Sequence, residues 1–527
     1  MSWHEPLLAL SPEILLTLTA ALLPLGIATV NRRGLIAGVT AAILLVAAFL
    51  VLGTVYTLPG LGWLPQGPYV AYGALEVDAF SAFFKLVFIG VALLVVLGSP
   101  GYFRERHQPE YYALLLFATV GMMVVASAND LITLFVGFEL ASFSTYALAG
   151  FFKRAGDSNE AALKYFIVGS LSSALTLFGI SIVYGITGDV SFNGLAQHAA
   201  TIAGELGQPG KIDRIPVLDL FAILFLLAGF GFKVAMVPFH MWAPDTYDGA
   251  PTTVSAFLAA GSKKLGFVAL FKVFLVGLAA LKVVNVGAWY GWEIYLTLLA
   301  IVTMTVGNLM ALRQDNLKRM LAYSSVAHAG YMLIAIAAAV LATNDPALRA
   351  ATTYLIAGGL FHIVTHAIMK SGAFLAIAGV SSAGIGENIE GWRGLGRRAP
   401  FVAFAMAVFM LSFAGIPPLA GFASKFVLFS GAVQTYQLTS NGWFLALVIA
   451  GILNSGLSLY YYARVVRVMY VDDAETATTP MPRLKVPLST TIAVGACLVG
   501  VLLIGLWWTP VIDFSLDAAG ALMATGP

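Results

Sequence analysis

The chain alternates between long apolar runs and short polar connections along almost its whole length. About fourteen of the runs contain 18 or more residues, enough to cross ~30 Å of hydrocarbon as a helix. Because they are continuous rather than alternating every second residue, they predict helices and exclude an outer-membrane barrel. The pattern predicts an all-α polytopic membrane protein with spans near 13–31, 34–55, 78–98, 110–127, 130–152, 160–186, 217–247, 250–281, 290–312, 317–341, 350–381, 400–430, 441–470 and 488–509.

Composition supports the same class of protein. Of the 527 residues, 60% are hydrophobic and 10% are charged, which excludes an ordinary soluble domain. The net charge is only +2 and the basic residues are dispersed, so we expect no nucleic-acid partner. The single cysteine, Cys497, cannot form an intrachain disulfide or hold a metal cluster alone. We therefore expect no cofactor in this chain.

The basic residues predict an orientation in the membrane. If the N-terminus is outside, sixteen of the 28 Lys and Arg residues fall in loops on the cytoplasmic side and four fall on the outer side. Cytoplasmic loops collect positive charge, so this split predicts a multi-pass protein of the inner membrane with both termini on the outer face. The other eight lie inside predicted spans and are Lys85, Lys164, Lys233, Lys263, Lys264, Lys272, Lys370 and Lys425.

Prolines interrupt two of the predicted spans. Pro238 follows Lys233 in the seventh span, and Pro417 and Pro418 precede Lys425 in the twelfth. Irregular backbone at membrane depth is tolerated where it is buried in protein or lines a water-filled cavity. The two breaks lie five spans apart, which predicts two inverted five-helix repeats with broken seventh and twelfth helices. The expected units are a three-span segment at 1–109, repeats at 110–281 and 282–470, and a loop, final span and short tail at 471–527.

Isolated charges inside these spans are the main functional signal. Glu139, Lys233 and Lys425 each lie far from other charged residues in their apolar segments, apart from His240 in the segment of Lys233. Intramembrane ionisable residues usually face a bundle interior or a hydrated path, and a set of Glu and Lys suits a proton relay. We expect Glu139 and Lys233 to form an ion pair that opens and closes during turnover, because an unpaired buried charge is strongly unfavourable.

The remaining lysines are harder to assign. Lys85 lies near a span end, where lysines snorkel to the headgroups, and for Lys272 the sequence leaves that role and a buried one open. Lys263 and Lys264 point about 100° apart on a helix, so at most one is expected to face the path of Lys233.

Histidines add a further polar face. His362, His366 and Lys370 recur every fourth residue, so they point to nearly one face of the eleventh span. No flanking carboxylate or cysteine completes a metal site there, and a proton-conducting stripe suits the spacing better than a metal. His328 is a lone imidazole in a helix of small residues, which leaves helix packing and proton transfer both open.

Several motifs then resemble a known family. The segments 77–81, 137–140, 160–166, 233–245, 323–330 and 415–418 resemble the antiporter-like membrane subunits of respiratory complex I, subunit N of NADH-quinone oxidoreductase most closely. The resemblance covers essentially the whole chain. Lys425 favours subunit N over subunit M, which tends to have a glutamate there. The stripe of His362, His366 and Lys370 looks more like subunits L and M or membrane-bound hydrogenase subunits.

The resemblance implies a proton-translocating, non-redox subunit of NADH-quinone oxidoreductase. It implies roles in translocation for Glu139, Lys164, Lys233, His240, Lys263 and Lys425. It places flavin, iron–sulfur clusters and quinone in partner subunits, and implies other membrane-arm subunits and the lipid bilayer as partners. It also selects Lys263 rather than Lys264 for a polar axis with Lys233 and Lys425. Competing functions are a stand-alone cation/proton antiporter, a hydrogenase-type complex, a membrane scaffold and a solute permease.

Overall fold

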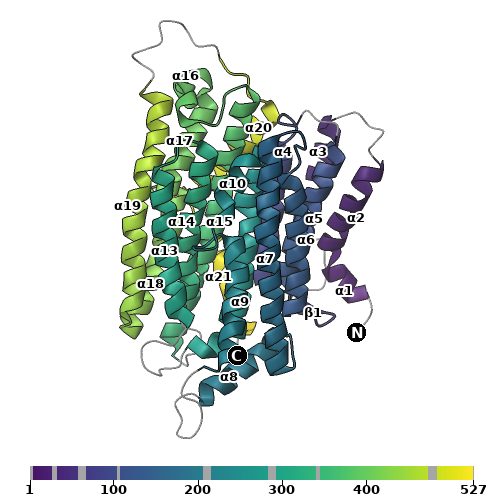
Figure 1. Ribbon diagram of the computed structural model, residues 1–527, viewed down its shortest axis with the longest axis vertical. Coiled ribbons are helices and arrows are strands. Elements are labelled where there is room, and N and C mark those ends of the chain that lie inside the picture. Colours follow the sequence, from purple (N-terminus) through teal and green to yellow (C-terminus); the bar gives the residue numbers. More distant parts are fainter. Residues whose placement is uncertain are drawn as a thin grey trace.

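The computed structural model describes residues 4–26, 33–56, 67–103, 107–205, 215–282, 292–339, 345–472 and 483–525. Twelve helices in these ranges are long and apolar enough to cross a membrane, and two shorter apolar helices lie at Ser11–Leu25 and Pro400–Ala414. The molecule is a bundle of long, roughly parallel and antiparallel helices (Figure 1). The prediction of a polytopic all-helical membrane protein is confirmed.

The elements follow the predicted spans closely. In chain order they are α1 (His4–Ala9), α2 (Ser11–Gly26), α3 (Arg33–Val55), β1 (Tyr69–Ala71), β2 (Leu75–Val77), α4 (Ala79–Gly98), α5 (Gln108–Ser127), α6 (Leu131–Ala149), α7 (Gly156–Thr187), α8 (Phe192–Glu205), α9 (Val217–Val234), α10 (Trp242–Gly249), α11 (Thr252–Phe257), η1 (Leu258–Ser262), α12 (Lys263–Leu270), η2 (Phe271–Gly277), η3 (Ala279–Lys282), α13 (Trp292–Leu312), α14 (Leu317–Ala337), α15 (Pro346–Ser382), η4 (Ile389–Trp392), α16 (Leu395–Arg398), α17 (Pro400–Ala414), α18 (Ala420–Thr439), α19 (Gly442–Tyr470), α20 (Leu488–Leu506) and α21 (Thr509–Thr525).

The two ends of the bundle differ. One end, called the hairpin end here, carries the antiparallel pair β1–β2 and the surface helix α8 (Figure 1). The other, the α16 end, carries η4, α16 and the starts of α7 and α14. Figure 1 marks both chain ends toward the hairpin end. This agrees with an even number of crossings.

Short polar side chains cap the N-termini of two long helices, α4 and α6. Asp78 caps α4 by accepting from the Ser81 backbone N–H at 2.7 Å, and the Ser81 hydroxyl accepts from the Asp78 N–H at 2.9 Å. Asp130 caps α6 in the same way, accepting from the Thr133 N–H at 2.7 Å. Such caps satisfy backbone donors that the first turn of a helix leaves free.

The two predicted breaks are present. Helix α9 ends at Val234 with Ala235 in the left-handed region (φ 52°), and α10 resumes the seventh span at Trp242. Helix α17 ends at Ala414 with Gly415 at φ 89°, and α18 begins at Ala420. Proline cannot donate the backbone bond that would continue either helix.

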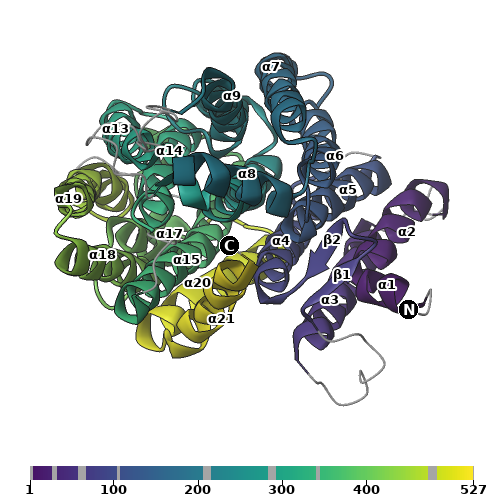
Figure 2. The same ribbon diagram turned by 90° about the horizontal axis from the view of Figure 1, so that it is seen from below.

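The eighth span is less regular than its sequence predicts. It contains two π-helical segments, η1 and η2, on either side of α12, which carries Lys263 and Lys264. The most apolar stretches of this span and of α14 are completely buried. Figure 2 shows α1 to α3 at one edge of the bundle, against α4 and α5, and α18 and α19 at the opposite edge. The eighth span and α14 therefore form the core.

The C-terminal segment also differs from the expectation of a short tail. Helix α21 follows α20, and Phe514 packs against Phe83 of α4 with ring centroids 5.2 Å apart. Apolar residues on the lateral surface, such as Leu171 (61% exposed) and Leu453 (68% exposed), face outward as lipid-exposed side chains do.

Candidate functional site

Lys233 lies in the last turn of α9, directly before the first break, and its side chain is buried. Its ammonium donates to the Ser142 hydroxyl at 2.9 Å and to the Tyr165 hydroxyl at 3.1 Å. Tyr165 stacks on Trp242 of α10, with ring centroids 4.6 Å apart. Hydroxyl groups both donate and accept, so Lys233 keeps partners whether or not it carries its proton.

Glu139 lies on α6, one turn before Ser142, and is half-buried. Its carboxylate accepts a hydrogen bond from the Ser173 hydroxyl of α7 at 2.5 Å. The described residues include no ion pair between Glu139 and Lys233, because each charge takes hydroxyl partners instead. The two groups are not in direct contact in this conformation, and an ion pair that opens and closes during turnover stays a prediction. Lys233 reaches Ser142, one turn from Glu139 on α6.

Both lysines of α12 are buried, and they point in different directions. Lys263 donates to the Ser325 carbonyl of α14 at 2.7 Å. Lys264 donates to the Ala259 carbonyl at 2.9 Å, and its Nζ lies 2.6 Å from Nδ1 of His366. The choice of Lys263 over Lys264 for the polar axis, which the family resemblance implies, stays a prediction. Lys264 is the residue that contacts the histidines.

Three histidines from two helices form one cluster. Nδ1 of His328 on α14 lies 3.0 Å from Nε2 of His362 on α15. The His328 ring also lies beside that of His366, with centroids 4.8 Å apart. On its other side, Nδ1 of His362 lies 2.9 Å from the Ser424 hydroxyl, next to Lys425 in α18. Each imidazole has two ring nitrogens that exchange donor and acceptor roles, so this row suits proton transfer.

Lys370 joins the cluster from the α16 end. Its ammonium donates to the Leu321 carbonyl at 2.8 Å and to the Ser324 hydroxyl at 2.7 Å. The Ser324 hydroxyl contacts the Tyr462 hydroxyl, which lies 3.4 Å from Nε2 of His328. The predicted stripe on α15 therefore meets side chains from α14, α18 and α19 in the core.

Lys425 lies beside the second break. Its ammonium donates to the Phe413 carbonyl at 2.9 Å and to the Ser455 hydroxyl at 3.1 Å. Phe413 is in the last turn of α17, where carbonyls lack partners within the helix. The ammonium also lies 4.6 Å from the centroid of the Tyr331 ring, a distance that favours a cation–π contact.

Two predicted site residues lie apart from this network. Lys164 is on α7 near the α16 end, where it contacts Glu160 at 2.7 Å and Asp245 at 2.9 Å. His240 is buried in the link between α9 and α10, and its Nδ1 has no hydrogen-bond partner among the described residues. The structure brings neither into contact with Lys233 or the histidines.

A polar cavity of about 330 Å³ opens near the α16 end. Arg319 lies 2.7 Å from Asp245 and 3.5 Å from Asp248 across it. Carboxylates outnumber cations around it, and its lining residues are Asp157, Glu160, Ala161, Lys164, Asp245, Asp248, Gly249, Asn316, Arg319 and Glu387.

Sequence reasoning missed the hydroxyl groups that join the charges. Ser142, Tyr165, Ser324, Ser424 and Tyr462 all contact a predicted lysine or histidine. One available signal is proximity, since Ser424 directly precedes Lys425 in an apolar helix. The tyrosines give no such signal, because they come from distant spans.

Residues 128–453, which contain the row from Glu139 to Lys425, match the family described as NADH:quinone oxidoreductase/Mrp antiporter, TM. The chain belongs to this family. Subunit N of the F(420)H(2) dehydrogenase of Methanosarcina mazei is 44% identical over 98% of this chain and 99% of its own length. Subunit N of the NADH-quinone oxidoreductase of Trichlorobacter lovleyi is 43% identical over 76% of each chain. The resemblance to subunit N, an antiporter-like membrane subunit, is confirmed.

A solved structure gives the same result. A chain of respiratory complex I from Thermus thermophilus is 30% identical, with a TM-score of 0.71, over 95% of this chain and 98% of its own. The fold is therefore that of antiporter-like subunits of respiratory membrane complexes.

Proposed function

We propose that this chain is a proton-translocating, non-redox membrane-arm subunit of a complex I-type quinone oxidoreductase. The observation that carries the proposal is the continuous buried contact from Lys264 through His366, His328 and His362 to Ser424, which neighbours Lys425. A row of lysine, imidazole and hydroxyl groups in an apolar core suits proton transfer. The stability of such a core does not require so many titratable groups.

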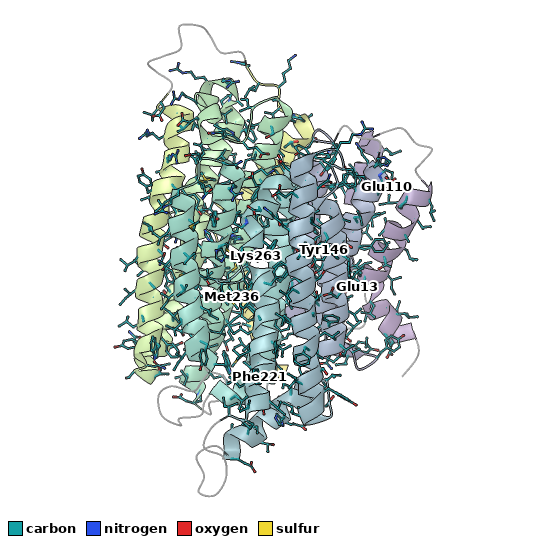
Figure 3. All side chains as sticks on the ribbon, in the orientation of Figure 1. Glu13, Glu110, Tyr146, Phe221, Met236 and Lys263 are labelled. Atoms are coloured by element: carbon teal, nitrogen blue, oxygen red, sulfur yellow. The ribbon has the colours of Figure 1, made fainter. Side chains whose placement is uncertain are left out.

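The row runs between the two broken helices. Lys233 lies beside the first break and Lys425 beside the second, and we place Lys263 and Lys264, on the buried eighth span, between them in the proton path. In Figure 3, Lys263 lies midway between the two ends of the bundle. Glu139, half-buried on α6, would couple Lys233 to a neighbouring subunit through charge rather than direct contact.

The polar cavity at the α16 end is the entry for protons from the cytoplasm. Buried polar atoms lead inward from it: Thr246 Oγ1, Tyr247 hydroxyl, Ser371 Oγ and His366 Nε2 have no hydrogen-bond partner among the described residues. Such groups are normally satisfied by ordered water, and water between them would connect Asp245 and Lys164 to the histidines. We place His240, whose Nδ1 has no hydrogen-bond partner among the described residues, in the same proton path beside the first break.

The proposed topology has fourteen crossings and two inverted repeats at 110–281 and 282–470. It counts α2, α9 with α10, α11 to η2, and α17 with α18 as one crossing each. The hairpin end is then the outer face and carries both termini. The basic Arg393, Arg397 and Arg398 near α16 support this orientation in the inner membrane.

The partners are other membrane-arm subunits, including paralogous antiporter-like subunits, and the lipid bilayer. Flavin, iron–sulfur clusters and quinone belong to partner subunits. The names of the relatives include both NADH and F(420)H(2) enzymes, so the electron donor is decided by the composition of the purified complex.

The proposal is tested with the purified complex in proteoliposomes. Lys425→Ala is expected to lower the number of protons pumped per electron while electron transfer to a soluble acceptor continues. Lys153→Ala, an exposed lysine near the α16 end, is the matched control. Unchanged pumping in Lys425→Ala would contradict the proposal. Cation exchange by the isolated chain, without electron-transfer partners, would instead favour a stand-alone antiporter.

A further inference from the structure

A second group of buried charges lies near the hairpin end, away from the row described above. It comprises Glu13 on α2, Glu76 on β2, Asp78 at the start of α4, Lys85 on α4 and Lys272 on η2. We call these five residues the hairpin-end cluster. The sequence predicts that Lys85 reaches the headgroups, and the structure contradicts this.

Lys85 points inward and meets an acid. Its Nζ lies 2.7 Å from a Glu13 carboxylate oxygen, and the two side chains are 2% and 9% exposed. Glu13 lies along the height of the bundle rather than beyond its end (Figure 3). Its second oxygen, Oε2, has no hydrogen-bond partner among the described residues. A buried ion pair with an unsatisfied oxygen contributes little to folding stability, which favours a functional role for Glu13 and Lys85.

Lys272 lies on the same span as Lys264, about 12 Å farther along its axis at 1.5 Å per residue. Its ammonium donates to the Ala128 carbonyl at 2.7 Å and lies 5.8 Å from the Phe80 ring centroid. Ala128 in turn pairs with Leu75, the residue before Glu76 on β2. Lys272 therefore lies between the central lysines and the acids of the hairpin end.

The π-helical segment η2 begins one residue before Lys272. Such segments are rare and occur frequently at functional sites. All seven residues of η2 are buried, so this irregular segment lies inside the protein and not at its lipid-facing surface.

Glu76 connects the cluster to the surface. It is half-buried on β2, outside the spans, and pairs across the hairpin with Val70. Burial raises the pKa of its carboxyl, the negative charge of Asp78 adds to the effect, and Lys272 opposes it. A carboxyl with a raised pKa suits transient protonation at a membrane surface.

We propose that the hairpin-end cluster is a proton-release site at the outward end of the eighth span. The Lys272 ammonium gives its proton to the Glu76 carboxylate, which releases it to water on the outer face. Neutral Lys272 is then reprotonated from Lys264 through intervening water. The Lys85 ammonium, which lies 2.7 Å from Glu13, repels the proton on Lys272 and so favours its release. This inference rests on the proposed function.

The test uses the purified complex in proteoliposomes and compares Lys272→Met with Lys272→Arg. Arginine keeps the charge but does not give up its proton, so both variants are expected to lower pumping per electron several-fold. Electron transfer to a soluble acceptor is expected to continue, and Lys153→Met is the matched surface control. Wild-type pumping in Lys272→Arg would overturn the inference, because Lys272 would then act only as a fixed charge.

Two further variants keep the test decisive. If the Lys272 variants fail to assemble, Glu76→Gln, which changes a half-buried hairpin residue, is expected to lower pumping several-fold, and normal pumping would overturn the inference. Lys425→Met is measured in parallel. If Lys425→Met abolishes pumping and the cluster variants do not, the release site is wrong and the proposed function stands. If Lys425→Met also pumps normally, the proposed function itself fails.

Discussion

Lys233 and Lys263, both buried in the core, have acceptors from helices far away in the sequence. Lys233 takes the hydroxyls of Ser142 and Tyr165, whereas Lys263 takes a backbone carbonyl. A carbonyl only accepts, so it stabilises an ammonium more than a neutral amine. A hydroxyl or imidazole partner stabilises both forms. The partners therefore make Lys233 and Lys264 better suited than Lys263 to exchange a proton with a neighbour.

This difference gives a prediction for the adjacent lysines of α12. Lys264→Ala is expected to lower proton pumping at least as much as Lys263→Ala, because only Lys264 contacts His366. The measurement is protons pumped per electron in proteoliposomes, with assembly checked by co-purification. A clearly larger loss from Lys263→Ala would support the family-based choice of Lys263 and contradict this prediction.

The serine before Lys425 gives a second prediction. Ser424→Ala removes the hydroxyl that lies 2.9 Å from His362 Nδ1 and 2.9 Å from Thr365 Oγ1. We expect pumping to fall several-fold while the complex still assembles, because the histidine row loses its contact toward Lys425. Ser458→Ala is the matched control, because among the described residues its hydroxyl donates to the Ser455 carbonyl and contacts no histidine. Equal pumping in the two variants would show that protons do not pass through Ser424.

At the scale of elements, the sequence predicted the features that depend on residues close together in the chain. Pro238 and Pro418 removed backbone donors, so the seventh and twelfth helices could be predicted to break. The buried charges were also visible as isolated residues. The π-helical segments, the Glu13–Lys85 contact and the tyrosine partners depend on packing between spans distant in the sequence, and no local pattern encodes them. The hydroxyl partners of Glu139 and Lys233 are not predictable for the same reason, because Ser142, Tyr165 and Ser173 reach them from other turns and helices.

Close packing of α12 against α9 gives a prediction at this scale. A Cβ on Gly266 would lie 2.7 Å from Val234 Cγ1 and 3.0 Å from the Val234 nitrogen. Gly266→Ala is therefore expected to push α12 away from α9, with a cost of about 1–3 kcal/mol typical of overpacking. Thermal unfolding of the purified complex measures this. Gly185→Ala, which has open space around its Cβ on α7, is expected to unfold at or above the wild-type temperature.

For the whole molecule, the charged groups are distributed along the direction that protons would take. An acidic cavity lies near the α16 end, the lysine and histidine row lies in the core, and the hairpin-end cluster lies near the opposite end. Proton pumping requires such separate entry and exit regions, because a single path open to both faces would dissipate the proton gradient.

The proposed direction of proton transport, from the acidic cavity to the hairpin-end cluster, requires that the α16 end faces the cytoplasm. This gives the last prediction. Sixteen of the 28 basic residues are assigned to loops on that side, and cytoplasmic loops collect positive charge. Cysteines introduced at Ser2 and Thr525 are expected to react with a membrane-impermeant thiol reagent from the outer side. Lys153→Cys is expected to react only from the cytoplasmic side. The one native cysteine, Cys497, is buried and gives a low background. Labelling of Ser2→Cys and Thr525→Cys from the cytoplasm only would reverse the orientation, and the acidic cavity would then face the proton-release side.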